Sequence, residues 1–232
     1  MKFPSPLVRA RLIKRYKRFL ADVELESGEC LTAHIANPGA MTGLAEPGME
    51  VWLSKSDNPK RKLAYSWELV RVGRCLVGVN AGLPNAIVEE ALRGGTIREL
   101  AGYSELRREV PYGSNSRVDF VLSGGRRKPH YVEVKNVTLK QGKLAAFPDS
   151  VTARGTKHLV ELASLARKGT LATMLYVVQR RDCDAFTVAG DIDPAYAAAL
   201  VEARAAGVGV LCYVCAMRTT SIRLETPMRI TI

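Results

Sequence analysis

The sequence predicts a two-domain protein of mixed α and β structure, with a small β-barrel or sandwich in residues 1–82 and a helix-covered mixed β-sheet in residues 83–232. The chain has 232 residues, of which 47% are hydrophobic, so two cores can form. Short strand-like runs separated by Gly and Pro turns fill the first third. Beyond Asn80, helical apolar spacing alternates with strand-like runs.

The strand-like runs of the first domain follow one another closely, and each ends at a turn-forming dipeptide or a glycine. Strands this short and this closely spaced favour a barrel or a sandwich over a sheet covered by helices. In chain order the runs are Arg18–Leu25, Leu31–Ile35, Met49–Leu53, Ala64–Val72 and Cys75–Val79.

The second domain begins with an apolar stripe at helical spacing in Ala86–Arg93, which Gly94-Gly95 ends. Two more helices are predicted, Ala153–Lys168 and Pro194–Ala206, and Asp193 is placed to cap the second of them. The predicted strands are Leu106–Tyr112, Arg117–Leu122, Tyr131–Leu139, Thr170–Gln179 and Val208–Val214. Their order with the helices predicts a mixed sheet with helices packed on its faces.

The formal net charge of +11 indicates a polyanionic partner, most often nucleic acid. Residues 1–20 hold seven basic residues and no acid, and Lys60, Arg61 and Lys62 form a second basic cluster. A solvated basic face is the alternative interpretation, and an anionic membrane surface is a weaker one. No run of about 18 apolar residues exists, and the first twenty residues lack the apolar core of a signal peptide. We therefore expect a cytoplasmic protein without membrane contact.

Five scattered cysteines do not form a secreted disulfide framework. Cys212 and Cys215 make a CxxC inside a predicted strand, where positions three apart point to opposite faces. Ordinary buried cysteines are therefore favoured over a zinc site.

Three charged residues lie inside two of the most apolar predicted strands. Glu133 and Lys135 are two positions apart and so project from the same face, and Asp119 lies in the preceding strand. The segment between these strands, residues 123–130, contains Gly124-Gly125 and three basic residues, which predicts a hairpin loop. Antiparallel pairing would place Asp119 close to Glu133.

Two carboxylates brought together in this way supply the oxygen ligands that Mg²⁺ or Mn²⁺ prefers. Such a metal neutralises phosphate charge and activates water, and Lys135 beside it could orient that water and stabilise developing charge. The pattern therefore predicts a site for phosphodiester hydrolysis at Asp119, Glu133 and Lys135. The alternative is a buried Asp, Glu and Lys network that only stabilises the sheet.

Asp119 followed by a hairpin and Glu133-Val134-Lys135 resembles the PD-(D/E)xK nuclease motif, although Val118 stands where the motif's leading proline would be. Over nearly its whole length the chain resembles the sugar fermentation stimulation protein A (SfsA) family. The segments that carry this resemblance are residues 15–23, 39–43, 77–80, 116–120, 133–139, 147–152, and Arg154, Gly155, Lys157 and His158. The sequence departs from the family at Ala36-Asn37-Pro38, where the family more often has Pro-Asn-Thr.

The resemblance implies an N-terminal OB-fold, a C-terminal PD-(D/E)xK nuclease-like domain, DNA binding without marked sequence preference, and a role in regulating sugar (maltose) metabolism. The superfamily usually adds an acid from the first core helix. Glu89 and Glu90 are both available by helical geometry, and the resemblance favours Glu90.

Further residues are candidates for binding the nucleic acid. Arg154, Lys157, His158 and Glu161 share one face of a predicted helix, which could hold a phosphate or could be an ordinary solvated face. In the first domain a cationic track with an aromatic side chain is typical of single-strand binding, although Tyr16 and Phe19 are more often core residues. The full set of candidates is Arg15, Tyr16, Lys17, Arg18, Lys60, Arg61, Lys62, Arg117, Arg154, Lys157 and His158.

Two functions of different classes follow. The first is a DNA-binding, Mg²⁺- or Mn²⁺-dependent nuclease. The second is a non-catalytic DNA-binding regulatory protein that keeps the nuclease fold as a scaffold. A carbohydrate-acting enzyme has little support, because no aromatic-rich cleft or well-spaced carboxylate pair is evident.

Overall fold

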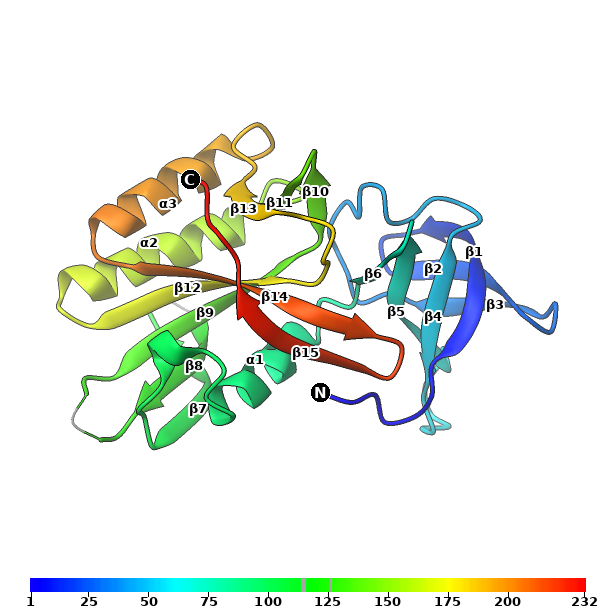
Figure 1. Ribbon diagram of the computed structural model, residues 1–232, viewed down its shortest axis with the longest axis horizontal. Helices are drawn as coiled ribbons and strands as arrows, with labels where there is room; N and C mark the ends of the chain where they lie inside the picture. The colour runs from blue at the N-terminus through cyan, green and yellow to red at the C-terminus, as the bar shows by residue number, and fades with distance from the viewer. Residues whose placement is uncertain (114–115, 126) are drawn as a thin grey trace.

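The computed structural model describes residues 1–113, 116–125 and 127–232, and it divides into a β-barrel and a larger mixed α and β domain (Figure 1). Arg126, one of the three basic residues of the predicted hairpin loop, lies outside the described residues. The barrel lies at one end of the long axis, and the α and β domain occupies the other (Figure 1).

The N-terminal domain is an OB-type barrel made from a sheet in the order β3-β2-β1-β4-β5-β6. A parallel bridge between His34 of β3 and Ser66 of β5 closes the sheet on itself. The strands are β1 (Val8–Tyr16), β2 (Leu20–Leu25), β3 (Cys30–His34), β4 (Glu50–Lys55), β5 (Tyr65–Val72) and β6 (Cys75–Gly78).

Strand β1 was not predicted from the sequence, because its alternation is partly hidden by charge. Ala10 and Leu12 point into the barrel core, whereas Arg9 and Arg11 between them are exposed. Small and aliphatic residues on one side and arginines on the other therefore make a half-buried strand in a basic segment.

The C-terminal domain is built on a six-stranded mixed sheet in the order β15-β14-β12-β9-β8-β7, with a small three-stranded sheet β10-β11-β13 beside it. Strands β9, β12 and β14 run parallel, and β8 pairs antiparallel with β9 as predicted. The strands are β7 (Glu105–Tyr112), β8 (Ser116–Ser123), β9 (His130–Val137), β10 (Leu139–Gln141), β11 (Leu144–Phe147), β12 (Leu171–Val178), β13 (Ala185–Val188), β14 (Gly209–Arg218) and β15 (Ser221–Pro227).

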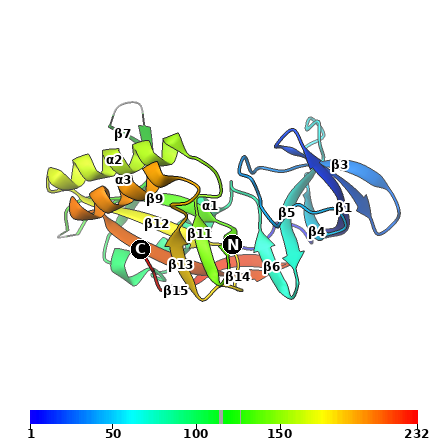
Figure 2. The same cartoon turned by 90° about the horizontal axis from the view of Figure 1, so that it is seen from above.

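In the described part of the chain three α-helices cover the large sheet, α1 on one side (Figure 1), and α2 and α3 side by side on the other (Figure 2). Helix α1 (Pro84–Arg93) packs on one face, and helices α2 (Ala153–Arg167) and α3 (Pro194–Ala205) pack on the other. A 3-10 turn, η1 (Arg98–Leu100), follows α1. All three predicted helices are confirmed within two residues, and Asp193 caps α3 as predicted by accepting a hydrogen bond from Tyr196 N.

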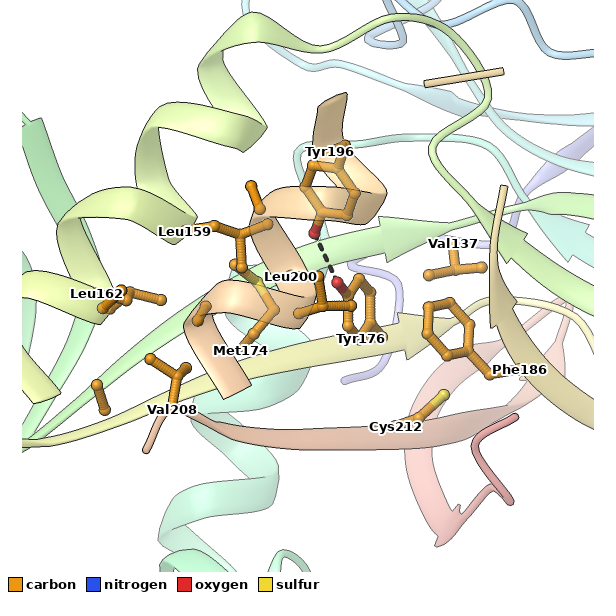
Figure 3. Packing of buried hydrophobic residues seen from close by; sticks show 14 of the residues in the cluster. Val137, Leu159, Leu162, Met174, Tyr176, Phe186, Tyr196, Leu200, Val208 and Cys212 are labelled. Carbon is orange, nitrogen blue, oxygen red and sulfur yellow. Dashed lines mark hydrogen bonds between the residues drawn. The ribbon is translucent and has the colours of Figure 1, made fainter. Parts of the chain in front are cut away.

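The core under α2 and α3 is a layer of aliphatic side chains closed by aromatic rings (Figure 3). The hydroxyls of Tyr176 and Tyr196 lie 2.6 Å apart, so each buried hydroxyl has a partner inside the core. Cys212 belongs to this layer and Cys215 to the opposite one, as expected for positions three apart on a strand.

The two domains share a buried interface. Trp52 of β4 and Leu69 of β5 leave the barrel core and pack with α1 and the α1-covered face of the large sheet. The first residues of the chain also reach the second domain, where Lys2 bridges to Ser221 and Phe3 N donates to Thr220 O. Among the described residues no helix is long and apolar enough to cross a membrane.

Candidate functional site

Asp119 lies where two strands of the large sheet separate. The β8–β9 pairing ends at Phe120 opposite Val132, and continuing the same register would set Asp119 opposite Glu133. Instead of a backbone carbonyl, the Asp119 Oδ2 atom accepts the hydrogen bond from Val134 N, at 2.7 Å. The side chain thus replaces a ladder acceptor and holds its carboxylate in the gap between the strands.

Glu133 and Lys135 project from the α2-covered face of β9, while Val132 and Val134 between them pack toward α1. Lys135 Nζ lies 2.7 Å from Glu133 Oε1, and the Glu133 side chain is 3% exposed. The second oxygen, Glu133 Oε2, is buried and has no hydrogen-bond partner among the described residues. A buried carboxylate oxygen without a donor is costly, so this atom is the strongest sign that something else binds here.

His158 of α2 completes the cluster from the helix side. Its Nδ1 atom contacts Glu133 Oε1, while Arg154 Nε donates to its Nε2 atom at 3.4 Å. Lys135 Nζ also lies 3.2 Å from Nδ1, so this ring nitrogen contacts both charged groups of β9. The sequence-predicted residues Asp119, Glu133, Lys135, His158 and Arg154 are therefore brought together by three elements, β8, β9 and α2.

The two carboxylates differ in protonation behaviour. Burial and the nearby negative charge of Glu133 raise the pKa of Asp119, which also indicates that the two groups lie within electrostatic reach of each other. Burial would raise the pKa of Glu133 too, but its hydrogen bond to His158 and the charge of Lys135 outweigh that effect and lower it. Glu133 is therefore the carboxylate held ionised, and Asp119 is the one that an added cation would help to ionise.

The donor set suits a cation that keeps several water ligands. No group of three or more His, Cys, Asp or Glu side chains in the described part of the chain is arranged to hold a metal ion. Mg²⁺ is usually bound through one or two carboxylates and retained waters, so two carboxylates are sufficient ligands for it. Within the described part of the chain Glu133 Oε2 has no hydrogen-bond partner, and each Asp119 oxygen accepts one hydrogen bond, which leaves a lone pair on each for a cation.

The acid expected from the first core helix lies elsewhere. Glu90 binds the N-terminal ammonium of Met1 at 2.6 Å, and Glu89 pairs with Arg93 and Arg108. The helix α1 residue that reaches the cluster is Asn85, whose Nδ2 atom donates to Asp119 Oδ1 at 2.8 Å. An uncharged side chain next to a proline carried no signal for this role in the sequence.

Two other predicted phosphate-binding residues lie at the margin of the cluster. Lys157 is half exposed on α2, with its Nζ 3.7 Å from Glu161 Oε1, and so extends the basic helix face. Arg117 is exposed on β8, two residues before Asp119.

The predicted track on the barrel contains one residue with an internal role. Arg15 is half-buried, and its guanidinium donates to the backbone carbonyls of Arg18, Asn37 and Gly39. It therefore braces the β1–β2 turn against the loop after β3. Tyr16 is half-buried and donates to Asp22 Oδ1 at 3.0 Å, while Lys17 and Arg18 are exposed.

The second basic cluster lies at the same end of the barrel. Lys60 and Lys62 are exposed, and Arg61 Nη2 donates to Ser66 Oγ, beside the bridge that joins β5 to His34. The His34 ring stacks on Phe19, whose side chain is exposed rather than in the core. We call this end of the barrel, formed by residues 16–19, His34 and 60–62, the barrel mouth.

A cavity of about 570 Å³ separates the barrel from the C-terminal domain. Arg18 and residues 37–39 line it from the barrel, and Asn136, Thr138 and residues 147–152 line it from the other side. At Gly39 the loop runs so close to Asp149 that an added Cβ would clash with the Asp149 carboxylate. Asp149 also accepts a hydrogen bond from Met41 N, so its carboxylate links the barrel loop to the C-terminal domain at the cavity.

Comparisons with known proteins agree with this two-domain organisation. A model of the SfsA N-terminal OB domain matches residues 13–79, and a model of the sugar fermentation stimulation protein RE domain matches residues 82–221. A sugar fermentation stimulation protein homolog from Maricaulis maris is 55% identical over 231 residues, covering 99% of this chain and 98% of that protein. Another from Paramagnetospirillum magneticum is 56% identical over 228 residues, covering 98% of this chain and 97% of the relative.

The fold also matches a solved structure described as Pyrococcus furiosus SfsA in complex with Ca²⁺. The TM-score is 0.92 at 25% sequence identity, over 100% of this chain and 98% of the other.

Proposed function

Because the chain belongs to the sugar fermentation stimulation protein (SfsA) family, we propose that it binds DNA without marked sequence preference and hydrolyses phosphodiester bonds with a divalent cation at Asp119 and Glu133. Family membership alone does not specify phosphodiester hydrolysis, so this reaction is the part that we propose. Cations such as Mg²⁺ or Mn²⁺ fit the two-carboxylate donor set.

The observation that carries the proposal is the convergence of Asp119 and Glu133 where β8 and β9 separate. Glu133 Oε2 is buried there, and no described residue donates to it. Lys135 pairs with the other oxygen of the same Glu133 carboxylate. The related P. furiosus protein was solved in complex with Ca²⁺, which supports a divalent cation in this fold.

Each side chain has a role that follows from its position. When bound, the cation would neutralise phosphate charge and lower the pKa of a water molecule. Lys135 can orient the attacking water and balance the charge that builds up on the phosphate. His158 holds Glu133 in place through Nδ1, and Arg154 orients the His158 ring. Asn85 fixes the Asp119 carboxylate.

The basic barrel would supply affinity for the phosphate backbone. Exposed cations lie at the barrel mouth, and one of them, Arg18, lines the cavity next to the C-terminal domain. The names of the relatives point to sugar fermentation, and DNA binding offers a route to a regulatory role there.

The first prediction concerns Asp119→Ala and Lys135→Ala. Each substitution removes a group that acts on the reacting phosphate, so we expect cleavage of plasmid and single-stranded DNA in Mg²⁺ or Mn²⁺ to fall by about 100-fold or more. DNA affinity measured in EDTA should stay within about twofold, because most affinity comes from the barrel.

Asp184→Ala is the matched control, because it removes an exposed carboxylate remote from the cluster. Unchanged cleavage in Asp119→Ala would contradict the nuclease assignment. Tight, salt-sensitive binding without any cleavage by the wild-type protein would favour the non-catalytic DNA-binding function instead. Absence of DNA binding at low salt would exclude both.

A further inference from the structure

Resting on the proposed function, we infer that the substrate strand reaches the candidate site as a single strand, with one nucleotide in the interdomain cavity and the next base stacked on Phe19. The inference names the substrate class, single-stranded DNA or an unpaired end, and assigns Phe19 as the residue that selects it. Three observations support it, at the barrel mouth, in the turn that presents Phe19, and in the cavity.

The first observation is the exposed aromatic ring at the barrel mouth. Phe19 is 43% exposed, and its inner side is covered by the His34 ring at 14° between planes, with centroids 6.4 Å apart. Lys17 and Arg18 directly precede it in the sequence, and Arg61 donates to Ser66, which pairs with His34 under the ring. An exposed ring among cations is the arrangement that stacks unpaired bases while the cations bind the backbone.

The second observation is that the ring is held in a preformed position. Lys17 and Arg18 both have positive φ, 48° and 61°, which side chains other than glycine rarely adopt. Arg15 stabilises this turn with hydrogen bonds to Arg18 O, and Ile35 N donates to Phe19 O at 2.9 Å. The Arg15 hydrogen bonds hold this turn in one conformation. Phe19 and the two cations are therefore already positioned, and binding a strand would cost little conformational entropy.

The third observation is the interdomain cavity, whose lining includes Arg18, the neighbour of Phe19 in sequence, and Asn136, the neighbour of Lys135. Arg18 lines one wall, and Thr152, the N-cap of α2, lines the other. His158 follows Thr152 by six residues on the same helix, a rise of roughly 9 Å. The path from the barrel mouth therefore leads along the first turns of α2 to Glu133 and Lys135.

The size of the cavity and its walls decide between single and paired strands. A volume of about 570 Å³ lies within the range of sites for one small ligand, such as a nucleotide. Residues 37–39 line the barrel side of the cavity, where Arg15 donates to Asn37 O and Gly39 O, and Met41 N just beyond them donates to Asp149. A complementary strand would collide with this fixed loop, so a duplex can approach only after its end has opened.

The test is fluorescence anisotropy in EDTA, with a short thymidine oligonucleotide and a blunt duplex of equal length, so that no cleavage is needed. Phe19→Ala should weaken single-strand binding by roughly 5- to 100-fold, the effect of losing one base-stacking contact, and duplex binding by less than about twofold. Phe19→Trp should preserve single-strand affinity. Val201→Ala removes an exposed apolar side chain on α3 and should change neither.

A second pair of variants tests the cavity. Ser150→Glu places a negative charge in the lining, where it would repel the strand, so single-strand affinity should fall by roughly tenfold. Ser164→Glu makes the same change on an exposed part of α2 away from the cavity and should have little effect.

The outcomes separate this inference from the proposed function. Equal loss of single-strand and duplex affinity in Phe19→Ala, or no loss in either, overturns the single-strand inference while DNA binding stands. An effect of Ser164→Glu as large as that of Ser150→Glu overturns the path through the cavity. A wild-type protein that binds neither oligonucleotide overturns both the inference and the proposed function.

Discussion

At the scale of single residues, Asp119 shows how one side chain can shape a sheet and serve a site together. By accepting from Val134 N it stops the β8–β9 ladder, and by accepting from Asn85 it is tied to α1. Each of its oxygens accepts one of these hydrogen bonds and so keeps a lone pair for a further ligand. The same carboxylate therefore opens the space that a cation and a phosphate would occupy.

His130 provides a pH-dependent prediction at this scale. Burial and the positive charge of Arg127 lower its pKa to about 4, while Thr173 Oγ1 lies 2.8 Å from Nε2 and Tyr103 OH lies 3.2 Å from Nδ1. The folded-state pKa lies below the ordinary value of 6.5, so the stability contributed by the neutral ring is present above pH 6.5 and is lost as pH falls toward 4.

We therefore expect the unfolding free energy of the wild-type protein to fall by about 1–2 kcal/mol more than that of His130→Gln over this interval, a value discounted for the partly exposed ring. Urea unfolding at several pH values measures the difference. His34→Gln, at the barrel mouth, is the control. Parallel pH profiles for the wild-type protein and His130→Gln would contradict the assigned shift.

Residue patterns in the sequence predict which charges are out of place, but not what surrounds them. Asp119, Glu133 and Lys135 stand out because charges interrupt apolar strands. Asn85 gives no such signal, because an amide near a helix start is ordinary. Arg15 resembles the other cations of its segment, and only the position of residues 37–40 makes it a brace rather than a surface charge.

At the scale of elements, Asp193 joins the starts of two helices. It is 2% exposed, caps α3 through Tyr196 N at 3.0 Å and accepts from Thr152 N at 2.8 Å, just before α2. Thr152 in turn caps α2 through Gly155 N. Because α2 carries Arg154 and His158, this carboxylate sets the position of the helix side of the candidate site.

Asp193→Ala would leave two amide donors without their partner inside the protein. We expect it to lower the unfolding free energy by about 2–4 kcal/mol, more than the loss of one ordinary cap. Chemical denaturation followed by circular dichroism measures the change, with Asp191→Ala, an exposed acid two residues earlier, as control. A loss below that of a single cap would show that the link to Thr152 contributes nothing.

The predicted helices and most strands agree with the structure, because their apolar spacing is regular. The run Tyr131–Leu139 was expected as one strand, but β9 ends at Val137 and β10 begins at Leu139 in another sheet. Composition does not reveal such a change of partner, since the residues on both sides remain β-forming. Strand β1 was not predicted for a different reason: the basic residues on its outward side hide the apolar alternation of its inward side.

At the scale of the whole molecule, adjacent residues of β5 serve different cores. Leu69 and Val70 are both fully buried, yet Leu69 packs in the interface with α1 and Val70 packs inside the barrel. Alternation along a strand explains the split. The sequence predicts that both are buried but not which core each one joins, because that depends on how the domains dock.

This pair separates domain coupling from barrel stability. Leu69→Ala should cost about 2–5 kcal/mol and split calorimetric unfolding into two transitions, because it leaves a cavity between the domains. Val70→Ala should lower stability within the barrel without a comparable loss of coupling. Differential scanning calorimetry measures both. A single, shared transition in Leu69→Ala would show that the remaining contacts suffice to couple the domains.

The alternation of β9 has a further consequence for folding fidelity. If this strand paired one residue out of step, Glu133 and Lys135 would enter the aliphatic layer beneath α1, and Val132 and Val134 would face His158. Such a slip would bury two charged side chains among hydrocarbon side chains without their native partners, and the desolvation free energy would destabilise the shifted pairing. The charged residues of β9 therefore favour the correct register of the sheet, independently of any role in binding a substrate.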